Sequence, residues 1–575
     1  MSQDKSEEII GIWRLTLVRI CLLLAVVAVL WKLASLILLE RDFLQGQGDA
    51  RTVRTEPLVA HRGMITDRNG EPLAISTPVK SIWVNPRQIA DKPAEITRLA
   101  DALSLDAESL ISSVQSNAGR EFMYVERRMP PADADAVLGL DIDGVYARQE
   151  YQRYYPQAEV TAHALGFSNI DDIGQEGLEL AYDEWLKGIP GSKQVVKDRR
   201  GKIVRELDTL ESAQPGNSLA LSLDFQLQNL AYRELKEAYI YRQARSASAV
   251  VLKAGTGEVL AMVNQPSFNP HNRSNISDFG ALRNRAITDL FEPGSTLKTF
   301  TAIAAIESGR YTPGTMINTS PGRMRVGRDW VSDRGQDFGE ISLEEMLVNS
   351  SNVASAKIAL DLGHEALRDV LLRVGFGENP ASGFPGERAG VMPNHRVWHD
   401  IEVATLSFGY GMSTSALQLA QAYSVIANDG LKVPVTFLKN GNEMDGAAAP
   451  QRVIDEDVVA QVTGMLKAVV DPEQGGGDSA AVPFYSIAGK TGTARVVGAN
   501  GYDSRLHNSM FAGFIPADDP EIIVVIVINE PQGREQYGGQ VAAPVFARIA
   551  AGAMRLMDVT PDRVSPENVM TLTAR

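Results

Sequence analysis

Three short motifs in the sequence hold residue types that could form a serine acyl-transfer site. The first is Ser295 followed by Lys298, directly after a Pro-Gly turn and at the start of a predicted helix, residues 297–309. A serine hydroxyl is a weak nucleophile until a base removes its proton. Lysine can be that base only where burial or a second cation keeps it neutral. The helix N-terminus at Ser295 favours developing negative charge, so the pair predicts a nucleophile and its base.

The other two motifs follow in the order Ser350-x-Asn352 and Lys490-Thr-Gly-Thr493. Alone, the first two motifs are weak signals, because Ser-x-x-Lys also occurs at Ser2 and Ser-x-Asn also occurs at Ser267. The third follows a strand-like run, and its glycine, Gly492, removes a side chain where another backbone could approach. The three motifs in this order, with Pro-Gly before the first and a strand at the third, are specific together.

Hydrophobic patterning predicts the elements that must position these motifs. Residues 219–224 alternate like a strand, and residues 225–239 carry apolar residues at helical spacing. Residues 246–265 read as two strands around a turn at 254–257. Residues 522–531 form a nearly continuous apolar run, which is typical of a strand buried on both faces. Strands at both ends of this region with helices between them predict an α+β domain with a central sheet.

Composition excludes several classes of protein. The chain has 575 residues, which predicts two to four domains. Its formal net charge of −15 argues against nucleic-acid binding. The single cysteine, Cys21, excludes disulfides within the chain and cysteine-ligated zinc. No histidine spacing favours a metal, since Pro393 argues against a zinc helix at His395 and His399. No phosphate-binding glycine pattern is present, so we expect neither metal nor cofactor.

A membrane anchor is predicted near the N-terminus. Residues 20–39 carry one charge, Lys32, over a length that can cross the hydrocarbon layer as a helix. The run is longer than the apolar region of a signal peptide. Lys32 is expected to snorkel outward, or else to contact another membrane helix. Arg14 and Arg19 precede the run and predict a cytoplasmic N-terminus, with the rest of the chain outside.

The predicted organisation has five parts. A short flexible spacer is expected at residues 45–50, and a composition change near residue 215 marks the main boundary. The parts are a cytoplasmic tail (1–19), a membrane anchor (20–39), a linker (40–50), an N-terminal domain (51–215) and a catalytic domain (216–575).

Further segments extend the motifs into a resemblance to a known family. Residues 62–70 (RGMITDRNG) and 174–179 (GQEGLE) match N-terminal signatures of class B penicillin-binding proteins. FEPGST, SSNV, FGYG, KTGTAR and GFIPADDPE are similar to the septal, FtsI-type branch, known in Gram-negative rods as penicillin-binding protein 3. The resemblance covers nearly the whole chain. One departure is Val496, where division enzymes commonly carry lysine.

The resemblance implies an α+β architecture and a reaction. A single membrane helix would carry an elongated pedestal domain of the dimerisation type and a transpeptidase domain, whose central antiparallel sheet is flanked by helices. The enzyme would be a peptidoglycan D,D-transpeptidase that cross-links stem peptides ending in D-Ala-D-Ala through a serine acyl-enzyme, and β-lactams would inhibit it covalently. Its place would be the inner membrane at the division septum, with the catalytic domain periplasmic. Expected partners are an FtsW-type glycosyltransferase and other division proteins, but no nucleic acid.

Catalytic roles are carried over motif by motif. Ser295 resembles the acylated nucleophile and Lys298 its base. Ser350 would relay a proton, and Asn352 would hold a substrate amide. Lys490 would provide the positive potential that keeps Lys298 neutral.

The substrate-binding roles lie mainly on the third motif. Thr491 and Thr493 would bind the terminal carboxylate, and Gly492 lies between them. The backbone N–H groups of Ser295 and Thr493 would form the oxyanion hole. Tyr410 and Arg495 are expected either to line the pocket or to support its structure.

Three alternative functions stay open on the sequence. The first is the elongation-specific paralogue, the second a β-lactamase or β-lactam sensor, and the third a scaffold with a vestigial site. A sensor would need several membrane helices, and only one is predicted. The intact motifs argue against a scaffold alone.

Overall fold

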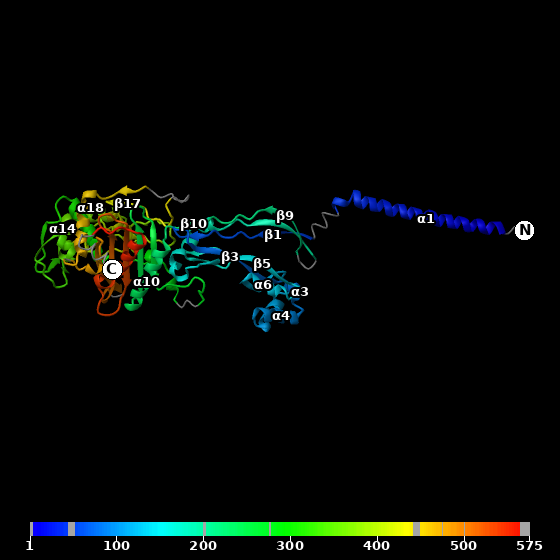
Figure 1. Cartoon of the computed structure of the whole chain (residues 1–575), viewed down its shortest axis with the longest axis horizontal. Helices are drawn as coiled ribbons and strands as arrows, with labels where there is room; N and C mark the ends of the chain where they lie inside the picture. Colours follow the sequence, from blue (N-terminus) through cyan, green and yellow to red (C-terminus); the bar gives the residue numbers. More distant parts are fainter. Residues whose placement is uncertain are drawn as a thin grey trace, which may run out of the picture. The chain divides into compact units, whose positions relative to one another are not determined.

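The chain folds into two compact units, each built from segments that are separated in the sequence. The computed structural model describes residues 4–43, 52–198, 203–274, 278–440, 449–473, 475–498 and 501–563 (Figure 1). Unit 1 comprises Met1–Ala60, Pro78–Tyr151 and Gly188–Pro215, and unit 2 comprises His61–Thr77, Gln152–Lys187 and Gly216–Arg575. Two early segments therefore fold with unit 2, whereas the sequence predicts one boundary near residue 215. The spacer predicted at residues 45–50 lies outside the described residues.

The N-terminal helix α1 spans Asp4–Leu38. Its stretch Trp13–Leu38 is long and apolar enough to cross a membrane, and its side chains are not packed against the rest of the chain. Lys32 Nζ donates to Glu40 Oε1 at 2.9 Å, just beyond the helix end. The ammonium group is therefore turned toward the C-terminal end of the helix, as expected of a snorkelling lysine.

Unit 1 contains a small sheet and a separate apolar core. Strands β1, β8 and β9 form an antiparallel sheet in the order β1-β8-β9. Short helices pack with β3 and β4 around Ile82, Val84, Ile96 and Leu99, all fully buried. The bounds are β1 Val53–Leu58, β3 Pro72–Val84, α3 Pro86–Ile89, α4 Pro93–Leu103, α5 Ala107–Ser116, β4 Met123–Met129, α6 Pro131–Leu138, β5 Val145–Tyr154, β8 Gly191–Lys197 and β9 Ile203–Glu211, of which β3 and β5 continue into unit 2.

The early segments of unit 2 are held by a buried ion-pair network. Arg62 Nε donates to Glu179 Oε2 at 2.7 Å, and Arg153 Nε donates to Glu179 Oε1 at 2.6 Å. Arg62 also pairs with Asp183 at 2.6 Å. The elements around the network are β2 Ile65–Thr66, η1 Ala158–Val160, α7 Ala162–Leu165, β6 Phe167–Ser168, β7 Gly174–Glu176, α8 Gly177–Ala181 and α9 Asp183–Leu186. This network explains why residues near 62 and 153 fold with unit 2.

A five-stranded antiparallel sheet forms the centre of unit 2, in the order β12-β11-β21-β20-β19. Strands β11 (Ser246–Lys253) and β12 (Val259–Gln265) form the predicted hairpin. The apolar run forms β21 (Ile522–Asn529), which pairs with β11 on one side and β20 (Gly501–Ile515) on the other. β19 (Ala488–Gly498) carries the Lys-Thr-Gly-Thr motif and is an edge strand of this sheet.

Helices cover both faces of the central sheet. On β21, Ile523 and Val525 belong to one core, and Ile522 and Val524 belong to the other. The alternation confirms the prediction of a strand buried on both faces. Helices α10 (Phe225–Tyr241) and α20 (Ala543–Leu556) pack on one face. On the opposite face, α11 (Arg285–Thr288), α17 (Ala416–Ala427) and α18 (Glu456–Val470) contact the sheet. The other helices that share this core are α12 Lys298–Glu307, α13 Leu343–Val348, α14 Asn352–Leu362, α15 His364–Arg373 and α16 Asp400–Leu406, and α14 and α18 are labelled in Figure 1.

Short elements complete unit 2. The strand predicted at residues 219–224 is only β10 (Leu219–Ala220), which pairs with β2, because Asp224 already caps α10 by accepting from Leu227 N at 3.0 Å. The remaining elements are η2 Phe279–Leu282, η3 Gly294–Leu297, β13 Met316–Asn318, β14 Arg323–Val326, β15 Asp329–Ser332, β16 Glu340–Ser342, β17 Leu431–Lys432, β18 Gln451–Arg452, η4 Asp478–Ala480 and α19 Gly538–Val541.

Candidate active site

The first motif forms a tight turn before a buried helix. Ser295 lies in the 3₁₀ turn η3, and α12 begins at Lys298. The turn requires glycine at position 294, where φ is +53°. A Cβ there would lie 3.1 Å from the carbonyl oxygen of Thr493, so the turn sits directly against β19. The structure thus brings the first and third motifs together.

Lys298 is the centre of a hydrogen-bond cluster. Its Nζ lies 3.0 Å from Ser295 Oγ, 2.6 Å from the Ser350 carbonyl oxygen, 3.2 Å from Ser350 Oγ and 2.7 Å from Asn352 Oδ1. The residue is fully buried. The first and second motifs therefore meet at one amine, within reach of the serine proton.

The second motif is positioned by an acid that the sequence did not single out. Ser350 has a φ of +56°, a left-handed conformation that costs free energy in a non-glycine residue. Asp333 accepts from Ser351 Oγ at 2.7 Å, and from the backbone N–H groups of Asn352 at 2.5 Å and Val353 at 3.0 Å. This carboxylate anchors the N-terminus of α14 and so fixes the turn that presents Ser350 and Asn352.

The third motif lies on the edge strand β19. Lys490 is 1% exposed, and its Nζ lies 3.5 Å from Thr491 Oγ1. Thr493 Oγ1 accepts from the backbone N–H of Gly538 at 3.0 Å. A Cβ at Gly492 would lie 2.5 Å from the side chain of Met510 and 2.8 Å from that of Thr296, so the space at this glycine is filled by side chains and not by the expected backbone.

Burial and nearby positive charge lower the pKa of both active-site lysines. Desolvation, followed by the charge of Lys490, holds the pKa of Lys298 well below its usual range. Desolvation and the charge of Arg334 lower the pKa of Lys490 to about 7. The lowered pKa of Lys298 favours the neutral amine, which is the form that a base requires. With a pKa of about 7, Lys490 has a charge that depends on pH near neutrality.

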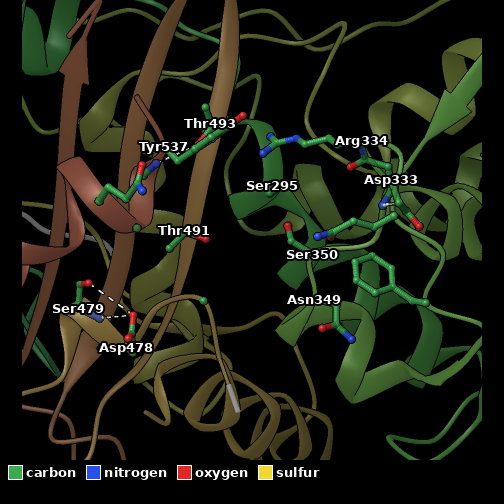
Figure 2. Close-up of a pocket in the computed structure, with 17 residues that line it drawn as sticks. Ser295, Asp333, Arg334, Asn349, Ser350, Asp478, Ser479, Thr491, Thr493 and Tyr537 are labelled. Atoms are coloured by element: carbon green, nitrogen blue, oxygen red, sulfur yellow. Dashed lines mark hydrogen bonds between the residues drawn. The ribbon is translucent and has the colours of Figure 1, made fainter. Parts of the chain in front are cut away.

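A pocket of about 340 Å³ opens in front of the cluster. Figure 2 shows Ser295 and Ser350 on one side and Thr491 and Thr493 on the other, with Arg334 reaching across from the Ser350 side. The further lining residues are Asp333, Gln336, Phe338, Asn349, Asn352, Gly476, Asp478, Ser479, Tyr537, Gly538, Gly539 and Gln540. All three motifs contribute to this wall.

Tyr410 and Arg495 lie beside the pocket rather than on its wall. Tyr410 Oη accepts from the backbone N–H of Arg495 at 3.3 Å, and the Arg495 side chain is exposed. The tyrosine ring contacts the ring of Tyr502 edge-on, with centroids 5.4 Å apart. Val496 falls at an irregularity in the pairing of β19 with β20.

A second missed carboxylate braces the same side of the site. Glu292 Oε1 accepts from Gly411 N at 2.8 Å and from Tyr502 Oη at 2.9 Å. Burial raises the pKa of this carboxyl group. The sequence could have indicated Glu292, because it lies three residues before Ser295. The sequence contains no such indication for Asp333, because this residue follows the β14–β15 hairpin and reaches the second motif only in the folded chain.

Among the residues that the structure describes, no group of histidine, cysteine or acidic side chains is arranged to hold a metal ion. The groups that meet at the site are serine hydroxyls, lysine amines and an amide. A neutral amine 3.0 Å from a serine hydroxyl, beside two threonines on an edge strand, is suited to acyl transfer.

Comparison with known proteins identifies the family. Residues 247–551 match the penicillin-binding protein transpeptidase domain, and residues 57–221 match the penicillin-binding protein dimerisation domain. The chain belongs to the penicillin-binding proteins. It is a serine-type peptidoglycan D,D-transpeptidase, and both the resemblance to class B penicillin-binding proteins and the predicted α+β fold are confirmed.

Individual members of the penicillin-binding protein family are similar over nearly the whole chain. The probable peptidoglycan D,D-transpeptidase PbpC of Pseudomonas aeruginosa is 40% identical, over 96% of this chain and 96% of that protein. The peptidoglycan D,D-transpeptidase FtsI of Escherichia coli K12 is also 40% identical, over 96% and 93%. The crystal structure of penicillin-binding protein 3 from Mycobacterium tuberculosis complexed with aztreonam covers 88% of this chain and 99% of its own, at 29% identity and a TM-score of 0.68.

Proposed function

We propose that this chain is a peptidoglycan D,D-transpeptidase that cross-links stem peptides at the division septum and is inhibited covalently by β-lactams. The observation that carries the proposal is the 3.0 Å contact between Lys298 Nζ and Ser295 Oγ, in a site that lowers the pKa of the lysine. The FtsI and PbpC relatives, which bear the name D,D-transpeptidase, support the substrate class.

The acylation step follows from the contacts of Lys298. Its neutral amine takes the Ser295 proton as Oγ bonds to the carbonyl carbon of the penultimate D-Ala. The backbone N–H groups of Ser295 and Thr493 stabilise the oxyanion. The peptide C–N bond then breaks, and the terminal D-Ala leaves with the proton, which Ser350 Oγ relays from Lys298 across 3.2 Å.

Deacylation reverses the proton path. The amine of a neighbouring stem peptide attacks the ester carbon and gives its proton to Lys298 through Ser350. Ser295 Oγ leaves as the ester C–O bond breaks, and it regains a proton from Lys298. The result is a new peptide bond and a free enzyme, with no change in the total number of protons. Asn352, which contacts the lysine at 2.7 Å, holds the donor amide.

The edge strand β19 provides the register for the donor. An extended peptide adds to its open edge by backbone hydrogen bonds. This places the terminal carboxylate beside Thr491 and Thr493, with the positive potential of Lys490 behind them. Tyr410 and Arg495 act as supports of this wall.

Membrane placement and partners complete the proposal. With Arg14 and Arg19 on the cytoplasmic side, residues 216–575 form a periplasmic catalytic domain carried by one inner-membrane helix. Residues 51–215 act as a pedestal that contacts an FtsW-type glycosyltransferase. Of the charged residues there, Arg62 and Glu179 are buried and cannot serve as contacts, whereas Arg148 is exposed.

The nucleophile is tested by labelling with a fluorescent penicillin and mapping of the labelled peptide. Ser295→Ala should abolish covalent labelling without loss of the fold, and the adduct should map to Ser295 in the wild type. Ser308→Ala, at the far end of α12, is the matched control and should label normally. Stoichiometric labelling of Ser295→Ala would contradict the assignment.

The septal role is tested by depletion of the protein in its own host. Filamentous cells support division, and round cells support elongation instead.

The penicillin adduct should persist for hours, because the proposed site has no group dedicated to activating a hydrolytic water. Rapid turnover would favour a β-lactamase.

A further inference from the structure

Arg334 is a strained residue on the pocket wall that the proposed mechanism does not use. It follows β15 and has a φ of +55°, which is costly for a non-glycine residue. Its side chain extends across the pocket toward the strand that carries Thr493 (Figure 2). Strain in a residue that lines a cavity is a reason to look for a function there.

The guanidinium group is held beside the threonines of β19. Its Cζ lies 4.9 Å from the ring centroid of Tyr537, a distance typical of a cation–π contact. Tyr537 precedes Gly538, whose backbone N–H donates to Thr493 Oγ1 at 3.0 Å. The aromatic ring therefore holds the cation on the side of the pocket that Thr493 and Gly538 form.

The charge around Arg334 is uncompensated. Within the part of the chain that the structure describes, its guanidinium forms no ion pair. The carboxylate of its neighbour Asp333 is committed to the N-terminus of α14. Asp478, the other acid on the wall, accepts from Ser479 N at 2.8 Å. Arg334 also adds positive potential at Lys298 and Lys490, since its charge lowers the pKa of both.

A planar guanidinium group recognises a carboxylate by two parallel hydrogen bonds. We propose that Arg334 is a specificity-determining residue whose guanidinium binds the C-terminal carboxylate of the donor peptide, opposite the hydroxyl groups of Thr491 and Thr493. The same contact selects β-lactams that carry a free carboxylate. The inference rests on the proposed function, because it names the part of the substrate that this site recognises.

The test compares one ligand with and without its negative charge. Acylation of the detergent-solubilised full chain is measured with benzylpenicillin and with its methyl ester, as second-order rate constants. Arg334→Ala should lower the rate with benzylpenicillin about tenfold and the rate with the ester less than twofold. Arg334→Lys should restore part of the loss, because it keeps the charge without the planar fork.

The acid-to-ester ratio is measured within one protein sample, so a smaller folded fraction in a variant does not change it. Arg323→Ala is the matched control, because Arg323 stacks on Trp330 at 5.1 Å and does not line the pocket. An equal loss with both ligands, or no loss, would overturn the role of Arg334. Failure of the wild type to react with benzylpenicillin would instead overturn the proposed function.

Discussion

Unit 2 contains two buried clusters of charged residues that are built on opposite rules. In the first, Glu179 lies between Arg62 and Arg153, and all three side chains are at most 1% exposed. In the second, Lys298 and Lys490 are equally buried, yet neither forms an ion pair within the described part of the chain. Burial of an uncompensated cation lowers its pKa, whereas a carboxylate partner raises it. The pKa of Arg62 is raised and that of Lys298 is lowered.

The difference separates a structural use of buried charge from a catalytic one. A compensated pair keeps its charge and fixes three segments that are far apart in sequence. An uncompensated lysine is costly to bury in its charged form, and this cost favours the neutral amine that a base requires.

The largest expected effect is on the chemistry of Lys298. Lys298→Arg should lower acylation by a fluorescent penicillin about 1,000-fold, because guanidinium cannot lose its proton to act as the base. Lys490→Arg should keep more activity, since its role is mainly a positive charge. Lys357→Arg is the control and should react normally, because Lys357 is a half-buried residue of α14 that donates to the Asn318 carbonyl oxygen and does not line the pocket. A near-normal rate for Lys298→Arg would show that another group takes the serine proton.

Next in size is the stability effect of the compensated cluster. Glu179→Gln should lower the free energy of unfolding by about 3 kcal/mol, because it leaves two buried arginines without full compensation. The thermal midpoint of the full chain in detergent measures it. Glu184→Gln removes an exposed pair with Lys187 and should cost less than about 1 kcal/mol. Equal midpoints for the two variants would refute the comparison.

Removal of a charge from the uncompensated cluster of Lys298 and Lys490 should raise the free energy of unfolding, the opposite of the effect expected at Glu179. Lys490→Met should raise the free energy of unfolding by about 1 kcal/mol at pH 7 while impairing acylation. The folded-state pKa of Lys490 is about 7, below the unfolded value near 10.4. The unfolded chain therefore binds more protons between these values, so wild-type stability contributed by this group rises with pH across that window. The gain from methionine should shrink toward pH 10. A stability gain from Lys490→Met that grew with pH would contradict the lowered pKa of Lys490.

A smaller shift is expected in the pH profile of acylation. The rate should fall as pH drops through the pKa of Lys298, at a pH well below that of an ordinary lysine. Lys490→Met removes one cause of the low pKa of Lys298, so the pH at which the acylation rate falls should rise by about one unit. If the pH at which the rate falls did not change, desolvation alone would set the pKa of Lys298. Stopped-flow measurement of the acylation rate across pH gives this value for the wild type and for Lys490→Met.

The smallest effect is expected at Glu292, which is intermediate between the two clusters. One oxygen accepts two hydrogen bonds, while the buried Oε2 has no hydrogen-bond partner among the described residues. Glu292→Gln keeps an acceptor and should change acylation less than about threefold. Glu292→Ala should cost about tenfold, because it frees the turn at Gly411. Equal effects of both would indicate a role for the charge itself.

Sequence reasoning reached those features that local patterns encode. The alternation of β21 between two cores and the β11–β12 hairpin were predictable, because each depends on residue type and local spacing. That the three motifs form one site was expected from their order and from the family resemblance. Asp333 and Arg334 were not, because their roles depend on a hairpin folding back onto α14 and onto Tyr537. The ion pairs of Glu179 were missed for the same reason, since Arg62 is 117 positions away.

The central position of β21 has a consequence for how the chain acquires its structure. β11 pairs with β12 soon after it is made, but its other edge waits for β21, and Asn529 lies 283 positions beyond Ser246. Such distant pairing is slow, because closing a long loop costs chain entropy before the contacts between the strands stabilise the pairing. Until then the chain exposes a strand edge and, later, an apolar β-prone segment, both of which favour aggregation. Molecular chaperones that shield unfolded chains should therefore increase the yield of folded protein. Substitutions that weaken the packing of β21 should reduce the amount of folded protein more than the reaction rate of each folded molecule.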